Sequence, residues 1–411
     1  MDQCILVAVR VAKAFRYRVY PTPKQVVRIH AWENALRSLW NLANEQRRMG
    51  YARPRDERVF PTAFDQINET TELRAEVPWL DDVPRNVCNQ LLVKLDEAWQ
   101  RCFKKIAKAP RWKRKGRDFL SLCEPHPKVW RLDGQTIRFP KLGNLRAVIH
   151  RPLEGKPKTC TLKRDGDQWF VSITCELKMD DLAPRVGPVV AIDRGVVNIV
   201  GDSDGKLVPS PRYYEKALKR LARAQRTVSR RKKGSKNREK AKIRVMKIHR
   251  QVRRQREHFL HTLSYSYAKS HGIVVFEKLN VYGMIRGRCA RGIADSGWAS
   301  FDHMLSYKLL WSGGRTEYVC AAFSSQTCSE IECQHVDANS RVSQSLFRCT
   351  KCGHTEHADL NAPKVLKQRF ETRASLSGLP GEGACSKEPL RTRKRVGLRV
   401  PRRSYRKSSG L

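Results

Sequence analysis

The stretch Pro188-Val189-Val190-Ala191-Ile192-Asp193 is an apolar run that ends on a carboxylate. A second run, Ile273-Val274-Val275-Phe276, ends in the same way on Glu277. Short apolar runs of this kind are typical of strands buried in a parallel sheet. About eighty residues separate the runs, and a helical crossover of about seventy residues is expected to join them as neighbouring parallel strands. We therefore predict an α/β unit in which both acids lie at adjacent strand ends.

A third carboxylate, Asp359, lies in His357-Ala358-Asp359-Leu360-Asn361-Ala362 and is expected to open a helix, where a negative charge is favourable. Any one such acid is more commonly a turn or cap residue. Acids from two strands and a helix that meet at one point can instead hold two divalent ions for phosphodiester hydrolysis. Mg²⁺ suits this chemistry because it binds carboxylates and keeps exchangeable waters. We predict two catalytic Mg²⁺ ions bound by Asp193, Glu277 and Asp359.

The charge of the chain favours nucleic acid as a partner. Its 82 Lys and Arg residues outnumber 40 Asp and Glu residues, which gives a formal net charge of +42 over 411 residues. Such an excess repels itself unless a polyanion neutralises it, although a ribosomal type of surface charge is the alternative. Together with the three acids, this charge points to a nuclease.

Four cysteines form a candidate zinc site. Cys328 and Cys333 are separated by four residues, Cys349 and Cys352 by two, and fifteen lie between the pairs. Two close thiolate pairs match a tetrahedral structural Zn²⁺ site with no open position. Because the first spacing is longer than usual, His335 could replace Cys333. His354 and His357 are expected to be polar loop residues.

The other nine cysteines are scattered, and an odd total of 13 in a large chain favours a reduced, intracellular protein. No stretch is long and apolar enough to suggest a signal core or a membrane span. We expect a cytoplasmic, nucleoid-associated protein with no membrane partner.

The first half of the chain predicts a small β-barrel that is interrupted by helices. Residues 14–20 alternate as a strand, Pro21-Thr22-Pro23 caps a helix starting near Lys24, and helical patterns continue to about residue 108. A basic break at residues 110–117 precedes short alternating strands between residues 129 and 177. Most aromatic residues of the helical insert are expected in its core.

Residues 212–256 are strongly basic, yet apolar residues recur at helical intervals. We predict two long helices joined at Lys233-Gly234-Ser235, with one face packed and the other able to follow a phosphate backbone. Residues 298–311 are expected to form a further helix. From Glu371 onward the sequence has little apolar periodicity, and a disordered tail is expected.

Several of these motifs together resemble the TnpB family, the RNA-guided DNA endonucleases of insertion-sequence transposons and relatives of type V CRISPR effectors. The resemblance runs from about Ala14 to Lys367. Its markers are Phe15-Arg16-Tyr17-Arg18-Val19-Tyr20-Pro21-Thr22-Pro23-Lys24-Gln25, Pro140-Lys141-Leu142-Gly143, Ser229-Arg230-Arg231-Lys232-Lys233-Gly234-Ser235, Phe259-Leu260-His261, Asp295-Ser296-Gly297-Trp298, Ser324-Ser325-Gln326-Thr327-Cys328 and the block around Asp359.

This resemblance implies a wedge barrel with an inserted helical recognition lobe, an RNase H-like nuclease domain of the RuvC type, and a zinc-ribbon insert. It also implies that the three acids are catalytic. The expected boundaries are 1–22 and 113–185 for the barrel, 23–112 for the lobe, 186–318 and 357–372 for the nuclease, 319–356 for the ribbon and 373–411 for the disordered basic tail. The chain departs from the family in its longer first cysteine spacing, in Pro363 where Ala is common, and in about a dozen extra residues before Ala14.

The family resemblance further implies a monomeric ribonucleoprotein that binds a transposon-derived guide RNA (omega RNA), recognises a short motif beside its double-stranded DNA target, and cuts both strands. We expect the motif to be read near the start of the helical lobe and around residues 112–117, although these residues could touch only phosphate. The candidate nucleic-acid contacts are Tyr20, Thr22, Lys24, Arg111, Trp112, Lys113, Arg114, Lys115, Arg230, Arg231, Lys232 and Lys233.

Two other functions fit parts of the pattern. A non-cleaving, RNA-guided DNA-binding repressor is the first, but such relatives usually lose one of the acids and this chain has all three. An RNA-independent transposase of the RNase H superfamily is the second, and it predicts activity without RNA.

Overall fold

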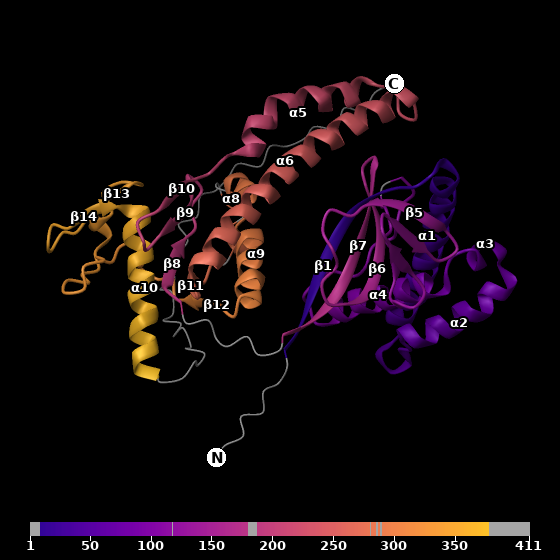
Figure 1. Ribbon diagram of the computed structural model, residues 1–411, viewed down its shortest axis with the longest axis horizontal. Helices are drawn as coiled ribbons and strands as arrows, with labels where there is room; N and C mark the ends of the chain where they lie inside the picture. The colour runs from indigo at the N-terminus through magenta and orange to yellow at the C-terminus, as the bar shows by residue number, and fades with distance from the viewer. Residues whose placement is uncertain are drawn as a thin grey trace, which may run out of the picture. The chain divides into compact units, whose positions relative to one another are not determined.

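The computed structural model describes residues 9–116, 118–179, 187–279, 281–284, 287 and 290–377. The chain divides into two compact units, residues 1–185 with 212–261, and residues 186–211 with 262–411 (Figure 1). The final helix, α10 (Ala358–Ser377), continues past the expected start of the tail at residue 373. The rest of the expected tail lies outside the described residues.

The first unit contains a seven-stranded antiparallel sheet built around β1 (Val9–Tyr20). Alternate residues of β1, namely Phe15, Tyr17 and Val19, are fully buried, so one face of the strand supplies the core. Five of the residues before Ala14 belong to this strand, because Val9 already pairs with Met179. The strand order is β2 (Leu122–Glu124), β6 (Lys156–Asp165), β7 (Gln168–Met179), β1, β5 (Gly143–Val148), β4 (Thr136–Phe139) and β3 (Arg131–Asp133).

Helices inserted between β1 and β2 complete the core of this unit. Thr22 caps α1 (Pro23–Ala52) as the sequence indicates, because its hydroxyl accepts a hydrogen bond from the backbone N–H of Gln25. Trp32, Trp40 and Trp99 are buried in the core that the helices share with the sheet, as expected for most aromatic residues of the insert, whereas Phe103 is 41% exposed. The elements are α1 (Pro23–Ala52), η1 (Arg55–Glu57), α2 (Ala63–Glu76), α3 (Pro78–Asp81) and α4 (Arg85–Phe103).

The two predicted basic helices are α5 (Tyr213–Arg230) and α6 (Lys236–Ser270). Gly234 lies in the turn between them with a φ of 85°, a conformation that favours glycine. Ion pairs fasten α6 to the β6–β7 turn of the sheet, from Arg250 to Asp167 and from Arg253 to Asp165, each at 2.5 Å. The second helix is longer than expected and ends at Ser270 instead of near residue 256.

The second unit contains a five-stranded sheet in the order β10 (Leu207–Pro209), β9 (Asn198–Asp202), β8 (Val189–Asp193), β11 (Ile273–Glu277) and β12 (Arg315–Val319). β8, β11 and β12 are parallel, as predicted for the first two, and β9 and β10 are antiparallel. α9 (Trp298–Trp311) packs on β12, and α10 packs along β8 and β9. Two shorter helices, α7 (Val281–Met284) and α8 (Ala290–Ser296), precede α9.

A small cysteine-rich segment lies between β12 and α10 and contains η2 (Ala338–Ser340) and the hairpin β13 (Leu346–Arg348) and β14 (Thr355–His357). Phe347 and two of the cysteines form its small buried core. Across the described part of the chain, no helix combines the length and the apolar character that crossing a bilayer requires.

Candidate active site

Asp193 and Glu277 are the last residues of neighbouring parallel strands. Ile192 of β8 pairs with Phe276 of β11, so the two acids follow at the same edge of the sheet. Glu277 is only 9% exposed. The side chains of Asp193 and Glu277 lie close enough for each to shift the pKa of the other. This close approach of two carboxyl groups is what the sequence predicted for these strand ends.

Asp359 reaches the same place from the first turn of α10. Its carboxylate accepts a hydrogen bond of 2.9 Å from the Asn198 amide of β9, and its charge acts on Asp193. The backbone N–H of Asp359 donates to Nδ1 of His357 at 3.1 Å, which caps the helix. The structure therefore brings together all three acids that the sequence proposed.

The electrostatics of the cluster favour a bound cation. Burial raises the pKa of Glu277 to about 8, and the charge of Asp193 adds to this rise. Burial also raises the pKa of Asp193, to which the charge of Asp359 contributes. Converging carboxylates that repel one another are the donor set that a divalent ion binds, and an ion lowers these pKa values.

The cysteines form a compact group of possible metal ligands. Within the described residues, only the four cysteines form a group whose ligand atoms all lie within 4.8 Å of one another.

A buried cation that no sequence pattern indicated lies beside the acids. Arg194 follows Asp193 directly and is 5% exposed. Its guanidinium donates to the backbone oxygen of Glu277 at 2.7 Å, pairs with Asp302 of α9 at 3.2 Å, and lies 4.9 Å from the centre of the Phe276 ring. Arg194 therefore ties together the ends of β8 and β11 and the helix α9, and its charge lowers the pKa of Glu277 against the larger effect of burial.

Two residues of β9 fit Asp359 to the sheet. Besides the Asn198 hydrogen bond, Gly201 lets the backbone approach, because a methyl group there would lie 2.0 Å from the carbonyl oxygen of Asp359. Pro363 has no backbone N–H, so it cannot donate a helical hydrogen bond to the carbonyl oxygen of Asp359 four residues earlier. The helix α10 nevertheless continues through Pro363. The position of Gly201 inside an apolar strand pattern was the sequence signal that could have predicted the close approach of β9 and α10.

The four cysteines converge as their spacing predicted. The sulfur atoms of Cys328 and Cys352 are 3.7 Å apart, as are those of Cys333 and Cys349. His335 accepts a hydrogen bond from the Cys328 N–H through its backbone oxygen and is not in the cluster, so the geometry favours Cys333 as the second ligand. Burial raises the pKa of Cys349, but N–H groups of Lys351 and Cys352 lower it to about 7, which favours a thiolate. This cluster fits the donor set of a zinc ribbon.

The cysteine-rich segment is fastened to the helix that carries Asp359. The Asn361 side chain accepts from the Ser329 N–H at 3.0 Å and donates to the Thr327 oxygen at 2.8 Å. β14 also runs directly into α10 at residues 357 and 358. Ordering of the cysteine cluster therefore bears on the position of Asp359.

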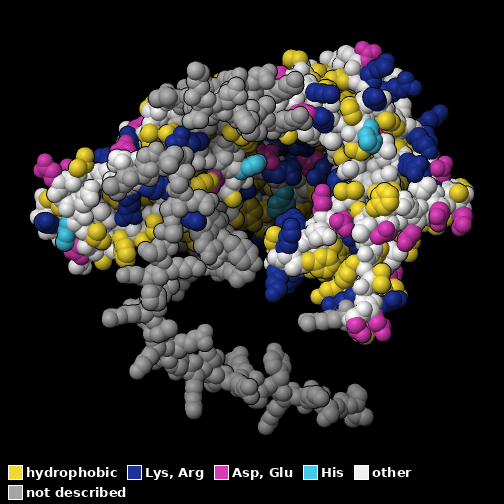
Figure 2. Space-filling view, turned by 90° about the horizontal axis from the view of Figure 1, so that it is seen from below, with side chains coloured by type: hydrophobic (Ala, Val, Ile, Leu, Met, Phe, Trp, Pro, Cys, Tyr) yellow, Lys and Arg dark blue, Asp and Glu magenta, His cyan; other side chains and the backbone are white. Residues whose placement is uncertain are grey.

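The candidate nucleic-acid residues occupy separate elements of the first unit. Lys24 and Tyr20 are exposed, whereas the Thr22 hydroxyl already serves as the cap of α1. Residues 230–233 are exposed at the end of α5 and in the turn that follows. Figure 2 shows Lys and Arg side chains in several groups over the visible face.

Residues 110–115, which we call the basic strap, are held rigidly along α1. The backbone oxygens of Pro110 and Arg111 accept from Asn44 and Trp40, and Asn41 bonds both backbone groups of Lys113. These hydrogen bonds hold the backbone of the strap on α1. Four side chains of the strap remain exposed to solvent, namely those of Arg111, Trp112, Arg114 and Lys115. A surface ordered before binding loses less entropy on binding a phosphate backbone.

Comparisons with known proteins agree with this architecture. Residues 172–288 match a family model described as a probable transposase (OrfB_IS605), residues 298–366 match the Cas12f1-like TNB domain, and residues 11–56 match a helix-turn-helix domain of the OrfB_IS605 type.

Two curated relatives cover most of the chain. The "Putative RNA-guided DNA endonuclease InsQ" of Escherichia coli K12 is 29% identical over 86% of this chain and 90% of its own length. A "Putative RNA-guided DNA endonuclease" of Streptomyces pristinaespiralis is 32% identical over 86% and 88%. Among solved structures, the Cas12f1 chain of a Cas12f1-sgRNA-target DNA complex is similar in fold, with a TM-score of 0.52 and 12% identity over 87% of this chain and 98% of that one.

Proposed function

The chain belongs to the TnpB family of RNA-guided DNA endonucleases, and on that premise we propose that it cuts both strands of a DNA target selected by a bound guide RNA. The observation that carries the proposal is the convergence of Asp193, Glu277 and Asp359 from two strands and a helix. We assign the catalytic role to these three acids.

In this proposal each acid has a distinct support. Glu277 is held by the Arg194 contact to its backbone, Asp359 is oriented by Asn198, and Asp193 lies between them. Two divalent ions, for which Mg²⁺ is the natural candidate, would supply the Lewis acidity that activates water and stabilises the leaving oxygen. One structural Zn²⁺ at Cys328, Cys333, Cys349 and Cys352 would order the segment fastened to α10.

The nucleic-acid contacts are assigned to the basic surfaces of the first unit. We propose that the exposed residues 230–233 and the basic strap bind phosphates of the guide RNA and the target DNA. Tyr20 and Lys24 are the side chains that we assign to reading the target-adjacent motif, whereas Thr22 acts mainly through its cap. We further propose a monomeric ribonucleoprotein that works in the nucleoid.

Cleavage assays with and without the copurified RNA test this function. The purified complex is expected to cut a guide-matched plasmid in Mg²⁺ and to lose this activity after removal of the RNA. Cleavage that is independent of RNA would indicate the transposase alternative. Guide-dependent binding without cleavage at any Mg²⁺ concentration would indicate the repressor.

A further inference from the structure

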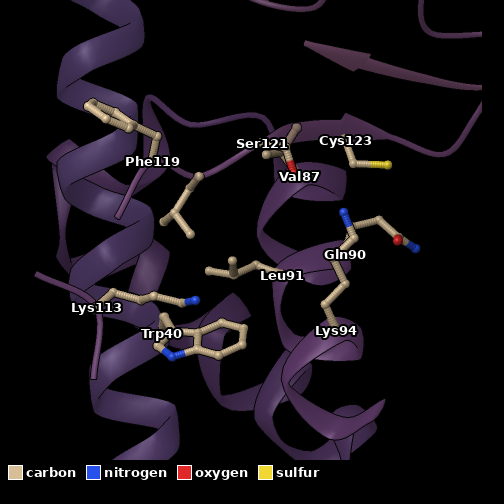
Figure 3. Close-up of a pocket in the computed structure, with 10 residues that line it drawn as sticks. Trp40, Val87, Gln90, Leu91, Lys94, Lys113, Phe119, Ser121 and Cys123 are labelled. Atoms are coloured by element: carbon tan, nitrogen blue, oxygen red, sulfur yellow. The ribbon is translucent and has the colours of Figure 1, made fainter. Parts of the chain in front are cut away.

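A small cavity lies between α1, α4 and the segment that leads into β2. Its volume is about 240 Å³, below the roughly 300–1,000 Å³ of pockets for drug-sized ligands. Figure 3 shows Trp40 and Lys113 at one end, Phe119 at another and the side chains of α4 along one side. The lining residues are Trp40, Val87, Gln90, Leu91, Lys94, Lys113, Phe119, Leu120, Ser121 and Cys123.

The lining suits a flat, electron-rich ring. Trp40 and Phe119 offer aromatic surfaces, and the Arg164 guanidinium lies 5.2 Å from the centre of the Phe119 ring. Gln90 offers an amide that can both donate and accept hydrogen bonds. Two lysines and no carboxylate line the cavity, so its occupant is expected to be attached to negative charge. The Lys113 ammonium lies 4.6 Å from the centre of the Trp40 ring, a position that a stacking ring could take over.

The cavity is also continuous with the basic strap. Lys113 belongs to both, and its backbone N–H and C=O are bonded to Asn41 at 2.8 and 3.0 Å. Trp40, which lines the cavity, donates to the strap at Arg111 with a distance of 3.1 Å. A strand whose phosphates lie on the strap therefore passes beside an aromatic cavity of limited size.

We propose that this cavity holds one unpaired nucleobase of the nucleic acid that crosses the basic strap. The proposal rests on the proposed function, because an RNA-guided nuclease opens a DNA duplex and so leaves bases without partners. An extruded base is recognised elsewhere by stacking and by hydrogen bonds to its edge, which are the contacts that Trp40, Phe119 and Gln90 offer. The target DNA is the favoured source, since its bases lose their partners when the duplex opens.

Abasic scanning of the nucleic acid tests the proposal. Complexes that carry Asp193→Ala, to prevent cleavage, bind guide-matched DNA in which one base at a time is removed near the start of the heteroduplex. In a second arm, single bases of the guide RNA are removed. Each series is measured with otherwise unchanged protein, with Phe119→Ala and with Gln90→Ala, and Phe64→Ala is the matched control because it is an exposed Phe (69%) on α2.

We expect Phe119→Ala to weaken binding of intact DNA about tenfold, as loss of one stacked base predicts. At one abasic position the same substitution should change the Kd less than about twofold, because the base that Phe119 contacts is already absent. Gln90→Ala should show its smaller effect at that same position. A position found only in the RNA arm would assign the base to the guide.

Two results would overturn the proposal. One is an equal effect of Phe119→Ala and Gln90→Ala at every position of both arms, and the other is an equal effect of Phe64→Ala. Failure of the proposed function is distinguishable, because the complex with an unchanged cavity would then not bind guide-matched DNA at all.

Discussion

The cysteine cluster and the carboxylate cluster are assembled from the chain in opposite ways. The cysteines come from one segment of residues 328–352, and their sulfur atoms form a compact group. The acids come from residues 193, 277 and 359, and burial together with the charges of their neighbours raises the pKa of Asp193 and of Glu277. A local, closed site is therefore suited to a structural ion, whereas a site built from distant, mutually repelling carboxylates is suited to exchangeable ions and chemistry.

The largest expected effect follows from removing one acid. Asp193→Ala should lower the cleavage rate by a thousandfold or so, since loss of a single electrostatic donor already costs about 10²–10³ in other enzymes. RNA-guided DNA binding should persist because the basic surfaces are unchanged. Plasmid cleavage and gel-shift assays measure both, and ordinary cleavage by the purified variant would refute the assignment.

Opening the cysteine cluster should have the next largest effect. Cys349→Ser removes one of four thiolates, and the segment fastened to α10 should lose order because metal binding and folding of such sites are coupled. Bound zinc per chain, the melting temperature and cleavage should all fall. Cys102→Ser is the control, since it lies outside the cluster. Full zinc content and cleavage in Cys349→Ser would contradict the structural role.

Loss of Arg194 should weaken the support of the carboxylate cluster. Arg194→Gln leaves the Glu277 oxygen and Asp302 with a poorer partner, and we expect about 2–3 kcal/mol lower unfolding free energy, somewhat below the cost of breaking a fully buried pair. The half-saturating Mg²⁺ concentration should rise, because the end of β11 is less firmly held. Chemical denaturation and Mg²⁺ titrations measure these quantities. If the unfolding free energy and the half-saturating Mg²⁺ concentration both stay unchanged, Arg194 does not support the carboxylate cluster.

A smaller effect is expected at Asn198. Asn198→Ala leaves Asp359 in place but without its orienting hydrogen bond, so cleavage should fall about tenfold, the equivalent of one hydrogen bond to a charged group. Asn198→Asp is the informative companion, because it places a fourth negative charge beside Asp359. Wild-type rates for Asn198→Ala over a Mg²⁺ titration would show that the hydrogen bond is dispensable.

The pH dependence of the metal-free protein should show the smallest effect. The pKa of Glu277 is raised to about 8, so the folded state holds a proton that the unfolded state has already lost above its ordinary pKa. The unfolding free energy should therefore decrease as pH rises from about 5 to 8, and Mg²⁺ should reduce the slope. Glu277→Gln removes this carboxyl group and should flatten the metal-free curve. An identical slope in Glu277→Gln would assign the effect to other groups.

The same two regions explain what the sequence could predict. Cysteine spacing and the apolar runs before Asp193 and Glu277 are local signals. As expected, the four cysteines form one cluster, and the two acids lie at the ends of neighbouring strands. Arg194 carried no such signal, because one buried arginine looks like any of the 82 basic residues until Asp302, far along the chain, is placed beside it. The roles of Gly201 and Asn198 were not predicted for the same reason, because both residues contact Asp359 only once α10 is packed on β9.

Anomalous diffraction from crystals of the complex soaked in Mn²⁺ would test the central claim most directly. The account predicts two Mn²⁺ ions bound by the carboxylates of Asp193, Glu277 and Asp359, and a separate zinc signal at the four cysteines. Mn²⁺ bound elsewhere, with any of the three acids remote from the ions, would contradict it.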